Sequence, residues 1–209
     1  MLYTEKIAWP SDPARPALLC RIVVLSLSDT FFPDVKLIEL NVFHDARGYF
    51  LESFQARRYG RLPGQAGPFV QDNFSQSRRG VLRGLHFQHP HGQGKLVRVA
   101  RGQVYDVVAD VRAGSPTFGK WQGFTLSDAR PRQLWIPPGY AHGFMALSDE
   151  ALVEYKCTDY YHPEHEACLR WDDPQLSIDW PLPDPIVSDK DRQGLTLQAL
   201  QEAGRCPAF

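Results

Sequence analysis

Histidines are the side chains of this sequence with the clearest chemical potential. His86, His89 and His91 lie within one stretch of six residues, and His142 follows the turn segment Pro137–Ala141. Imidazole titrates near neutral pH and therefore serves as a general base, and it is also a frequent metal ligand. This grouping predicts either proton-transfer chemistry or a metal site.

The segment around His142 resembles the second motif of the cupins. A metal-binding cupin supplies two histidines as HxH, a glutamate about four residues on, and a later histidine. His89 and His91 have the first spacing, but Lys95 or Leu96 stands where the glutamate would be. An ammonium group repels a divalent ion. The chain therefore resembles a cupin without its metal, and a metal-dependent cupin, an oxygenase or isomerase, is the competing hypothesis.

Each of these histidines also has an ordinary structural interpretation. Pro90 and Gly92 place His89 and His91 on a loop, where an exposed histidine is commonplace. His142 follows a turn, which suits a hydrogen-bonded structural histidine equally well.

Short strand signals separated by turns dominate the sequence from about residue 34 onward. Arg101-Gly102-Gln103 separates two alternating runs as a hairpin would. Many short strands with few helices predict an all-β sandwich or barrel rather than βαβ units. Strands are expected at Val35–Val42, Gly48–Phe54, Lys95–Ala100, Val104–Val111, Trp121–Leu126, Gln133–Ile136 and Ala151–Thr158. Helix is expected only at Gln55–Leu62 and around Leu195, Leu197 and Leu200 near the carboxyl end.

Length and composition indicate one folded domain of ordinary size. The 209 residues are 43% apolar and 22% charged, as in soluble globular proteins. Lys and Arg, 23 in number, nearly balance the 24 Asp and Glu, so no global basic field would recruit nucleic acid or an anionic membrane. No apolar run reaches the roughly 18 to 20 residues of a membrane-spanning helix.

Cysteine usage and the amino-terminal segment predict a cytoplasmic protein. Four widely spaced cysteines form no CxxC pair, which favours reduced thiols: Cys20, Cys157, Cys168 and Cys206. The apolar run Ala17–Leu27 is interrupted by Arg21 and follows mixed charges, unlike a secretion signal. Residues 1–32 read as an amino-terminal extension, either disordered or an added arm.

Several unusual motifs follow one another in order over most of the chain. They are Phe43–Glu52, Gln71–Asn73, Gly80–Gln88, Gln93–Arg98, Ser115–Gly119, Ile136–Phe144, Tyr155-Lys156, Tyr160-Tyr161, Trp171–Pro174 and Ser188–Asp191. Together they resemble the family of deoxythymidine-diphosphate (dTDP) 4-dehydrorhamnose 3,5-epimerases. The resemblance implies a cupin-like β jelly roll, a double-stranded β-helix with a few short peripheral helices, over residues 33–192. Residues 193–209 are then expected to form a carboxyl-terminal helical tail.

The resemblance implies an isomerase that needs neither cofactor nor metal. The expected reaction converts dTDP-4-dehydro-6-deoxy-D-glucose to dTDP-4-dehydro-L-rhamnose by epimerisation at C3 and C5 through enolate intermediates. This step supplies dTDP-L-rhamnose for cell-surface polysaccharide. An epimerase that inverts a single carbon, C3 or C5, of another dTDP-deoxysugar remains an alternative, because such relatives keep the histidine base. A silent nucleotide-sugar-binding module is a third hypothesis.

Epimerisation beside a ketone needs a base, a group that stabilises the enolate and an acid on the opposite face. By resemblance, His86 is the base and Asp191 fixes its tautomer. Lys95 would stabilise the charge on the C4 oxygen, which replaces the function of a metal. Tyr155 would be the acid; without the resemblance, its alternating segment indicates only a core or surface aromatic.

Recognition of the substrate is expected to involve both diphosphate and nucleobase contacts. Arginine suits phosphate, and Arg83 would reach the same face as His86 if their segment is irregular or bulged. The resemblance adds Arg47, Glu52, Gln71, Asn73, His142, Glu166 and Lys190 as substrate contacts, with Tyr161 stacking on thymine. In this family the early strands are exchanged between two subunits. The resemblance therefore implies a homodimer in which Arg47 and Glu52 would serve the neighbouring subunit's site.

Overall fold

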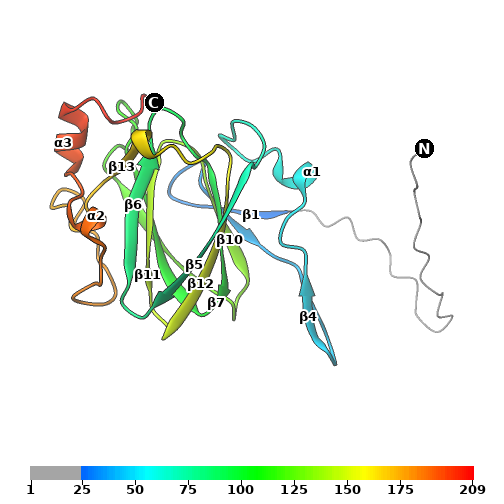
Figure 1. The fold of residues 1–209 in the computed structure, drawn as a ribbon. Helices are drawn as coiled ribbons and strands as arrows, with labels where there is room; N and C mark the ends of the chain where they lie inside the picture. Colours follow the sequence, from blue (N-terminus) through cyan, green and yellow to red (C-terminus); the bar gives the residue numbers. More distant parts are fainter. Residues whose placement is uncertain (1–24) are drawn as a thin grey trace.

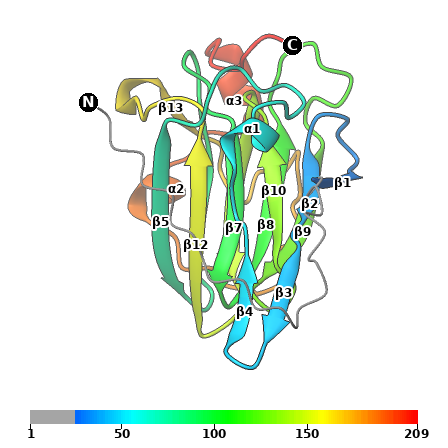
Figure 2. The same cartoon turned by 90° about the vertical axis from the view of Figure 1, so that its right-hand side faces the viewer.

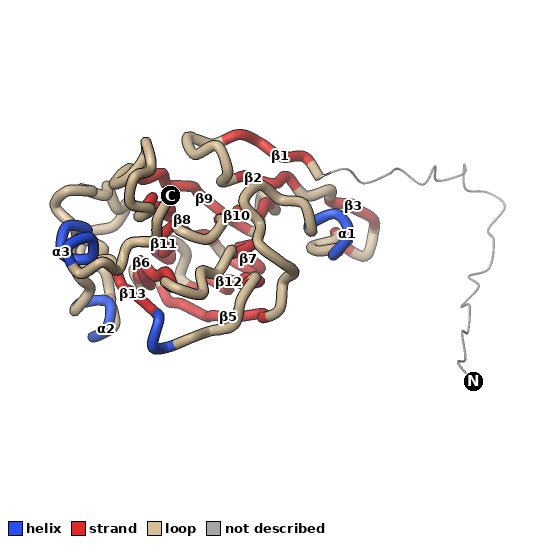
Figure 3. Tube along the Cα trace, turned by 90° about the horizontal axis from the view of Figure 1, so that it is seen from above, coloured by secondary structure: helices blue, strands red, loops and turns tan. Residues whose placement is uncertain are grey.

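Two antiparallel β-sheets face one another in residues 25–209, the part of the chain that the computed structural model describes. The first sheet has six strands in the order β1-β2-β10-β7-β12-β5, and the second has five in the order β13-β6-β11-β8-β9. Viewed from above, the two sheets enclose a common interior (Figure 3). This arrangement confirms the predicted all-β jelly roll.

The elements are short, as the sequence predicts. The first sheet comprises β1 Ser26–Asp29, β2 Lys36–Glu39, β10 Arg132–Ile136, β7 Lys95–Arg101, β12 Glu150–Cys157 and β5 Gln71–Arg78. The second comprises β13 Glu166–Cys168, β6 Leu82–Gln88, β11 Tyr140–Ala146, β8 Gln103–Asp110 and β9 Trp121–Ser127. A hairpin of β3 Val42–Asp45 and β4 Gly48–Leu51 projects away from the sheets (Figures 1 and 2). The helices are α1 Ala56–Tyr59, η1 Pro163–His165, α2 Asp189–Arg192 and α3 Leu197–Glu202.

Side chains point alternately to the two faces of each strand, and the buried apolar ones form one inner hydrophobic core and two outer cores. Val97 of β7 and Val108 of β8 belong to one buried cluster, which fills the space between the sheets. Ala141 of β11 faces the other way and shares a cluster with Leu197 and Leu200 of α3. The carboxyl-terminal segment therefore covers the outer face of the second sheet. The inner positions that are not apolar form the site described below.

The turn Arg101-Gly102-Gln103 does not make the predicted hairpin. It joins β7 of the first sheet to β8 of the second, and neither strand pairs with the other. Gly102 has a φ of 82°, a conformation that glycine adopts without steric penalty and that lets the chain pass between sheets. The hairpin prediction was wrong because alternation identifies a strand but not its neighbours.

Helix is shorter than the sequence predicts. Of the expected helix Gln55–Leu62, only Ala56–Tyr59 is helical, because Gly60 and Pro63 oppose its continuation. The helix α2 was not predicted at all. The Ser188 side chain caps it by accepting a hydrogen bond from the Asp191 backbone, and this single turn carries Lys190 and Asp191 to the second sheet.

The amino-terminal residues that the structure describes belong to the packed fold. Strand β1 pairs with β2, and Phe32 is buried in the inner core. The remainder of the predicted extension, including Cys20, lies outside the described residues. Cys157, Cys168 and Cys206 are free thiols. Within residues 25–209, no helix has the length and apolar character that crossing a membrane requires.

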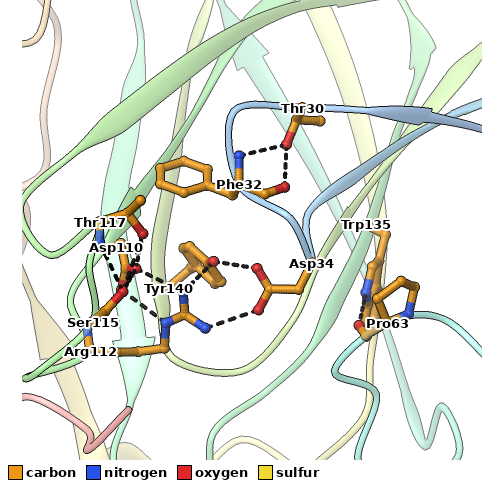
Figure 4. A network of polar contacts seen from close by, with 10 residues as sticks. All are labelled: Thr30, Phe32, Asp34, Pro63, Asp110, Arg112, Ser115, Thr117, Trp135 and Tyr140. Atoms are coloured by element: carbon orange, nitrogen blue, oxygen red, sulfur yellow. Dashed lines mark hydrogen bonds and ion pairs between the residues drawn. The ribbon is translucent and has the colours of Figure 1, made fainter.

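A polar network fixes the start of β11, the strand that carries His142 (Figure 4). Arg112 donates to Asp110 at 2.8 Å and to Asp34 at 2.9 Å. The Tyr140 hydroxyl donates to the other oxygen of Asp34 at 2.5 Å. Because hydrogen bonds between ionised groups are the stronger kind, the network holds the segment before β2 against β8 and β11.

Candidate active site

A cavity of about 530 Å³ opens between the two sheets, a size typical of small-molecule sites. Inward-facing positions of four strands meet there: His86 on β6, Lys95 on β7, His142 on β11 and Tyr155 on β12. An adjoining cavity of about 280 Å³ shares three of these side chains and is also lined by Gln71 and Asn73 of β5. The sheets thus bring together residues that are distant in sequence.

A bulge in the ladder between β6 and β11 places Arg83 in the larger cavity. His142 pairs with His86, but two residues later Phe144 pairs with Arg83. Arg83 and His86 therefore both line the cavity, whereas regular alternation would point them to opposite faces. Arg83 was predicted to reach the face of His86 only if their segment is bulged, and this bulge is present. Arg83 is oriented by a hydrogen bond from Nε to Ser77 Oγ at 2.9 Å.

His86 and Asp191 form a hydrogen-bonded pair at the cavity wall. His86 Nε2 lies 2.6 Å from Asp191 Oδ1, and the Gly84 backbone lies 3.4 Å from the other oxygen. Burial alone would raise the pKa of the Asp191 carboxyl, but the hydrogen bond and charge of His86 hold it below its usual range. An ionised Asp191 keeps the proton on Nε2, so Nδ1 is left with a lone pair that can accept a proton.

Lys95 is the buried cation of the site, with only 7% of its surface exposed. Its Nζ donates a hydrogen bond to the backbone oxygen of His86 at 3.1 Å. Burial lowers the pKa of Lys95, and the nearby Cys157, Glu166 and Asp106 oppose that effect. An ammonium in such a poorly solvated place interacts strongly with any anion that forms beside it.

Tyr155 lines both cavities together with His86 and Lys95, and its strand β12 pairs with β7, which carries Lys95. Burial raises the pKa of the Tyr155 phenol above its ordinary value. The hydroxyl therefore remains protonated at neutral pH and can donate a proton.

A second histidine–aspartate pair, His142 and Asp106, is buried in the barrel, and only its histidine was predicted as a site residue. His142 Nε2 is 3.0 Å from both carboxylate oxygens of Asp106, and Asp106 is fully buried. Asp106 was not predicted as a site residue. Its signal was a lone carboxylate within the apolar strand Val104–Val111. The pair fixes the ring of His142 at the cavity wall, as a structural histidine would be fixed.

The predicted recognition residues Tyr161, Glu166 and Lys190 meet at the cavity mouth. The Tyr161 hydroxyl donates to Glu166 Oε2 at 2.8 Å, and Lys190 forms an ion pair with the same oxygen. Burial alone would raise the pKa of Glu166, but the hydrogen bonds from Lys190 and Tyr161 hold it below its usual range. On β5, Gln71 Nε2 donates to Asn73 Oδ1 at 3.0 Å.

Arg47 and Glu52 are not brought to this site. Arg47 lies at the tip of the β3–β4 hairpin, pairs with Asp45 and is 89% exposed. Glu52 follows the hairpin and pairs with Arg58. Neither residue lines the two cavities that contain His86.

The trio proposed for a metal-dependent cupin is not assembled either. In residues 25–209, two groups can place three donor atoms within 4.8 Å of one another: His86, Cys168 and Asp191, and His91, Asp159 and His162. Neither group combines His89, His91 and His142. His142 is instead bound to Asp106, and the His91 ring stacks on that of His162.

The chain that forms this cavity is similar to known proteins over most of its length. The family model of dTDP-4-dehydrorhamnose 3,5-epimerase matches residues 29–199. The chain belongs to this family. The dTDP-4-dehydrorhamnose 3,5-epimerase of Pseudomonas aeruginosa is 56% identical over 163 residues, which cover 78% of this chain and 90% of that relative.

A solved structure and a further relative agree with this assignment. The crystal structure of dTDP-6-deoxy-D-glucose-3,5-epimerase from Legionella pneumophila, in complex with dTDP-4-keto-L-rhamnose, has a TM-score of 0.85 and 51% identity. The match covers 88% of this chain and 98% of that one. The dTDP-4-dehydrorhamnose 3-epimerase of Streptomyces niveus is 42% identical over 166 residues, 79% of this chain and 80% of the relative. The protein is therefore an isomerase with the cupin-like jelly roll of these epimerases.

Proposed function

We propose that the enzyme inverts both C3 and C5 of dTDP-4-dehydro-6-deoxy-D-glucose to give dTDP-4-dehydro-L-rhamnose, with His86 as base and Tyr155 as acid. The observation that carries this proposal is the meeting of the His86–Asp191 pair, Lys95 and Tyr155 around one cavity. The Legionella relative, in complex with dTDP-4-keto-L-rhamnose, supports the substrate class.

In each inversion, His86 Nδ1 removes the proton from the carbon beside the C4 ketone. The electron pair of that C–H bond moves into a new carbon–carbon double bond, and the C4 oxygen becomes an enolate. The Lys95 ammonium stabilises this oxygen, a contribution of several kcal/mol for donors placed where charge develops. Tyr155 returns a proton to the opposite face as the C4 ketone reforms.

This cycle leaves His86 protonated and Tyr155 as a phenolate. Both groups are reset by proton exchange with water before the second carbon reacts. Protons at inverted carbons are therefore drawn from solvent. The same cycle, applied first to one carbon and then to the other, gives the double epimerisation without a redox step.

The product distinguishes the double reaction from its alternative, a single inversion as in the 3-epimerase of Streptomyces niveus. Proton NMR of the sugar after incubation with dTDP-4-dehydro-6-deoxy-D-glucose should show the L-rhamno configuration at C3 and C5. Inversion at one carbon alone would identify a single-carbon epimerase, and an unchanged sugar bound to the protein would indicate a silent binding module.

The proposal includes a homodimer in which the β3–β4 hairpin reaches the partner's cavity. The hairpin projects from the barrel and exposes large apolar side chains, with Phe50 69% and Tyr49 56% exposed. Exposed apolar surface of this kind is typical of interaction sites. Arg47 and Glu52 would then contact substrate bound to the other subunit. Sedimentation equilibrium should report twice the 23.7 kDa chain mass, and a monomer would contradict this part of the proposal.

We place the enzyme in the cytoplasm, where its product would supply activated L-rhamnose for cell-surface polysaccharide. The free thiols Cys157, Cys168 and Cys206 suit a reducing compartment. Cell fractionation with an antibody to the chain should recover it with cytoplasmic markers, and recovery with the envelope would contradict the placement.

A further inference from the structure

Three of the seven histidines of this chain gather outside the active-site cavity. The His91 ring stacks on His162 with centroids 4.3 Å apart and on His165 with centroids 5.2 Å apart. Asp159 lies beside them, with its Oδ2 3.4 Å from His91 Nδ1. We refer to His91, Asp159, His162 and His165 as the histidine cluster.

We propose that the histidine cluster binds a borderline transition-metal ion of the Zn²⁺ or Ni²⁺ class, with His91, Asp159 and His162 as ligands. One donor atom from each of these residues lies within 4.8 Å of the others. Two imidazoles and one carboxylate form a mixed nitrogen and oxygen set, which suits zinc and nickel rather than magnesium or calcium. The fourth position is open to water or to the His165 imidazole.

The backbone of the cluster is held in place by polar side chains that do not themselves bind the ion. Gln88 is buried and donates from its amide to the backbone oxygen of His91 at 2.7 Å, while its oxygen accepts from the His162 backbone at 2.9 Å. Gln93 donates to the backbone oxygen of Asp159 at 2.9 Å. The ligand-bearing segments are therefore fixed before binding, which reduces the entropy lost on coordination.

The ligand side chains are only partly enclosed, and His162 Nδ1 also lies 3.5 Å from Glu164 Oε1. The side chains of His91, His162 and Asp159 are 48%, 30% and 33% exposed. Rotation of the rings out of their stacked arrangement would let the donor nitrogens approach a common ion to about 2.0–2.2 Å. The same exposure gives the ion an open path from solvent and makes it removable by a chelator.

The position of the cluster gives the ion a structural consequence. His91 lies on the loop after β6, whereas Asp159 and His162 lie on the segment between β12 and β13. This second segment also carries Tyr161, which binds Glu166 at the cavity mouth. A bound ion would join the two segments and restrain the mouth without taking part in proton transfer. The proposal is independent of the function proposed above.

Zinc binding to the untagged, chelator-treated full chain tests the proposal. Equilibrium dialysis at pH 7.5 should show that the wild type binds Zn²⁺. His91→Ala and His162→Ala should each bind one equivalent per chain less than the wild type. The same amount of bound ion should remain in His89→Ala, which alters a histidine of the same loop outside the cluster. Zinc should also raise the melting temperature of the wild type by several degrees, and this shift should disappear in both cluster variants.

A separate variant distinguishes the cluster from the other donor group of the described chain. Cys168→Ser weakens the group of His86, Cys168 and Asp191 but leaves the histidine cluster intact, so its zinc stoichiometry should match that of the wild type. Loss of the one equivalent of bound zinc in Cys168→Ser would overturn the proposal and place the ion in the active site. Unchanged binding in both cluster variants, or no binding to the wild type, would also overturn it. Melting curves without metal check that each variant is folded.

Discussion

Asp191 Oδ1 lies 2.6 Å from His86 Nε2, although 105 residues separate the two in the sequence. The contact depends on the single turn α2, which is capped by Ser188 and lies against β6. It assigns the proton to Nε2 and leaves the lone pair on Nδ1, so a residue near the carboxyl end sets the tautomer of a histidine on β6.

Asp191→Asn should therefore reduce kcat strongly while the fold persists. The neutral amide no longer holds the proton on Nε2, and losses of roughly 10²–10⁴-fold are typical when a base loses its correct protonation state. Steady-state turnover measures the effect. Asp189→Asn, on the same turn, is the matched control and should remain near wild type. Equal activity of the two variants would contradict the role of Asp191.

The same pair has a consequence for acid stability. The pKa of Asp191 is lower in the folded chain than the unfolded value of about 3.9, so its contribution to stability is present above that pH. The contribution is lost as the pH falls through the folded pKa. The difference in melting temperature between wild type and Asp191→Asn should therefore shrink below about pH 4. A difference that stays constant from pH 7 to pH 3 would show that ionisation of Asp191 does not stabilise the fold.

Lys95→Met should separate function from stability. Loss of a charge that stabilises the enolate should reduce turnover by about 10²–10³-fold. The same change removes a buried ammonium, whose burial lowers the pKa of Lys95. The melting temperature should rise by about 2–4 °C for each kcal/mol by which the free energy of unfolding increases. Turnover and thermal melts are measured on the same sample. Retained turnover would exclude Lys95 from the chemistry, and a lower melting temperature would show that its contacts outweigh its burial.

Tyr155→Phe should impair net inversion more than proton removal. His86 and Lys95 are intact in this variant, so an enolate can still form, but no group returns a proton to the opposite face. Deuterium should still enter the recovered substrate while product formation falls about 10²-fold or more. Equal loss of exchange and of product would argue against Tyr155 as the acid.

Tyr161→Ala should raise KM with a smaller effect on kcat. Stacking of one base on an aromatic ring is worth about 1–3 kcal/mol, so an increase of about 5- to 150-fold is expected if Tyr161 holds the thymine. Tyr160→Ala removes a neighbouring aromatic that is 60% exposed and lines neither active-site cavity, so its KM should not change. A similar KM for both variants would contradict stacking by Tyr161.

The proposed exchange of the β3–β4 hairpin between subunits can be tested by complementation between two impaired variants. Arg47→Ala and His86→Ala should each be impaired, because the first lacks the arm residue and the second lacks the base. In a mixed dimer, one cavity would combine an intact His86 with the partner's intact arm. Co-expression should therefore restore about a quarter of the wild-type activity. Activity no higher than that of Arg47→Ala alone would contradict exchange.

Much of the fold followed from the sequence because alternation and turn residues are local signals. The strand at Trp121–Ser127 was predicted to within one residue. The partners of each strand are not local properties, which is why the turn at Gly102 was misread as a hairpin. Strands β6 and β11, which carry His86 and His142, gave no alternation signal, because both faces of their sheet are covered and most of their residues are buried.

The meeting of His86, Lys95 and Tyr155 in one cavity was predictable, because all three lie within the family motifs. Asp106 was indicated only weakly, as an acidic residue within the apolar strand Val104–Val111. The histidine cluster could not be predicted, because His91 and His162 meet through the packing of two loops. The spacing of His89 and His91 suggested instead a cupin trio with His142, which the described residues do not assemble.

Deuterium incorporation tests the central claim most directly. The wild type, without added metal, is incubated with dTDP-4-dehydro-6-deoxy-D-glucose in deuterated water, and the sugar is analysed by mass spectrometry. The account predicts two deuterons, one each at C3 and C5, and none for His86→Ala although that variant still binds the nucleotide. One deuteron would reduce the enzyme to a single-carbon epimerase, and two deuterons in His86→Ala would remove His86 from the mechanism.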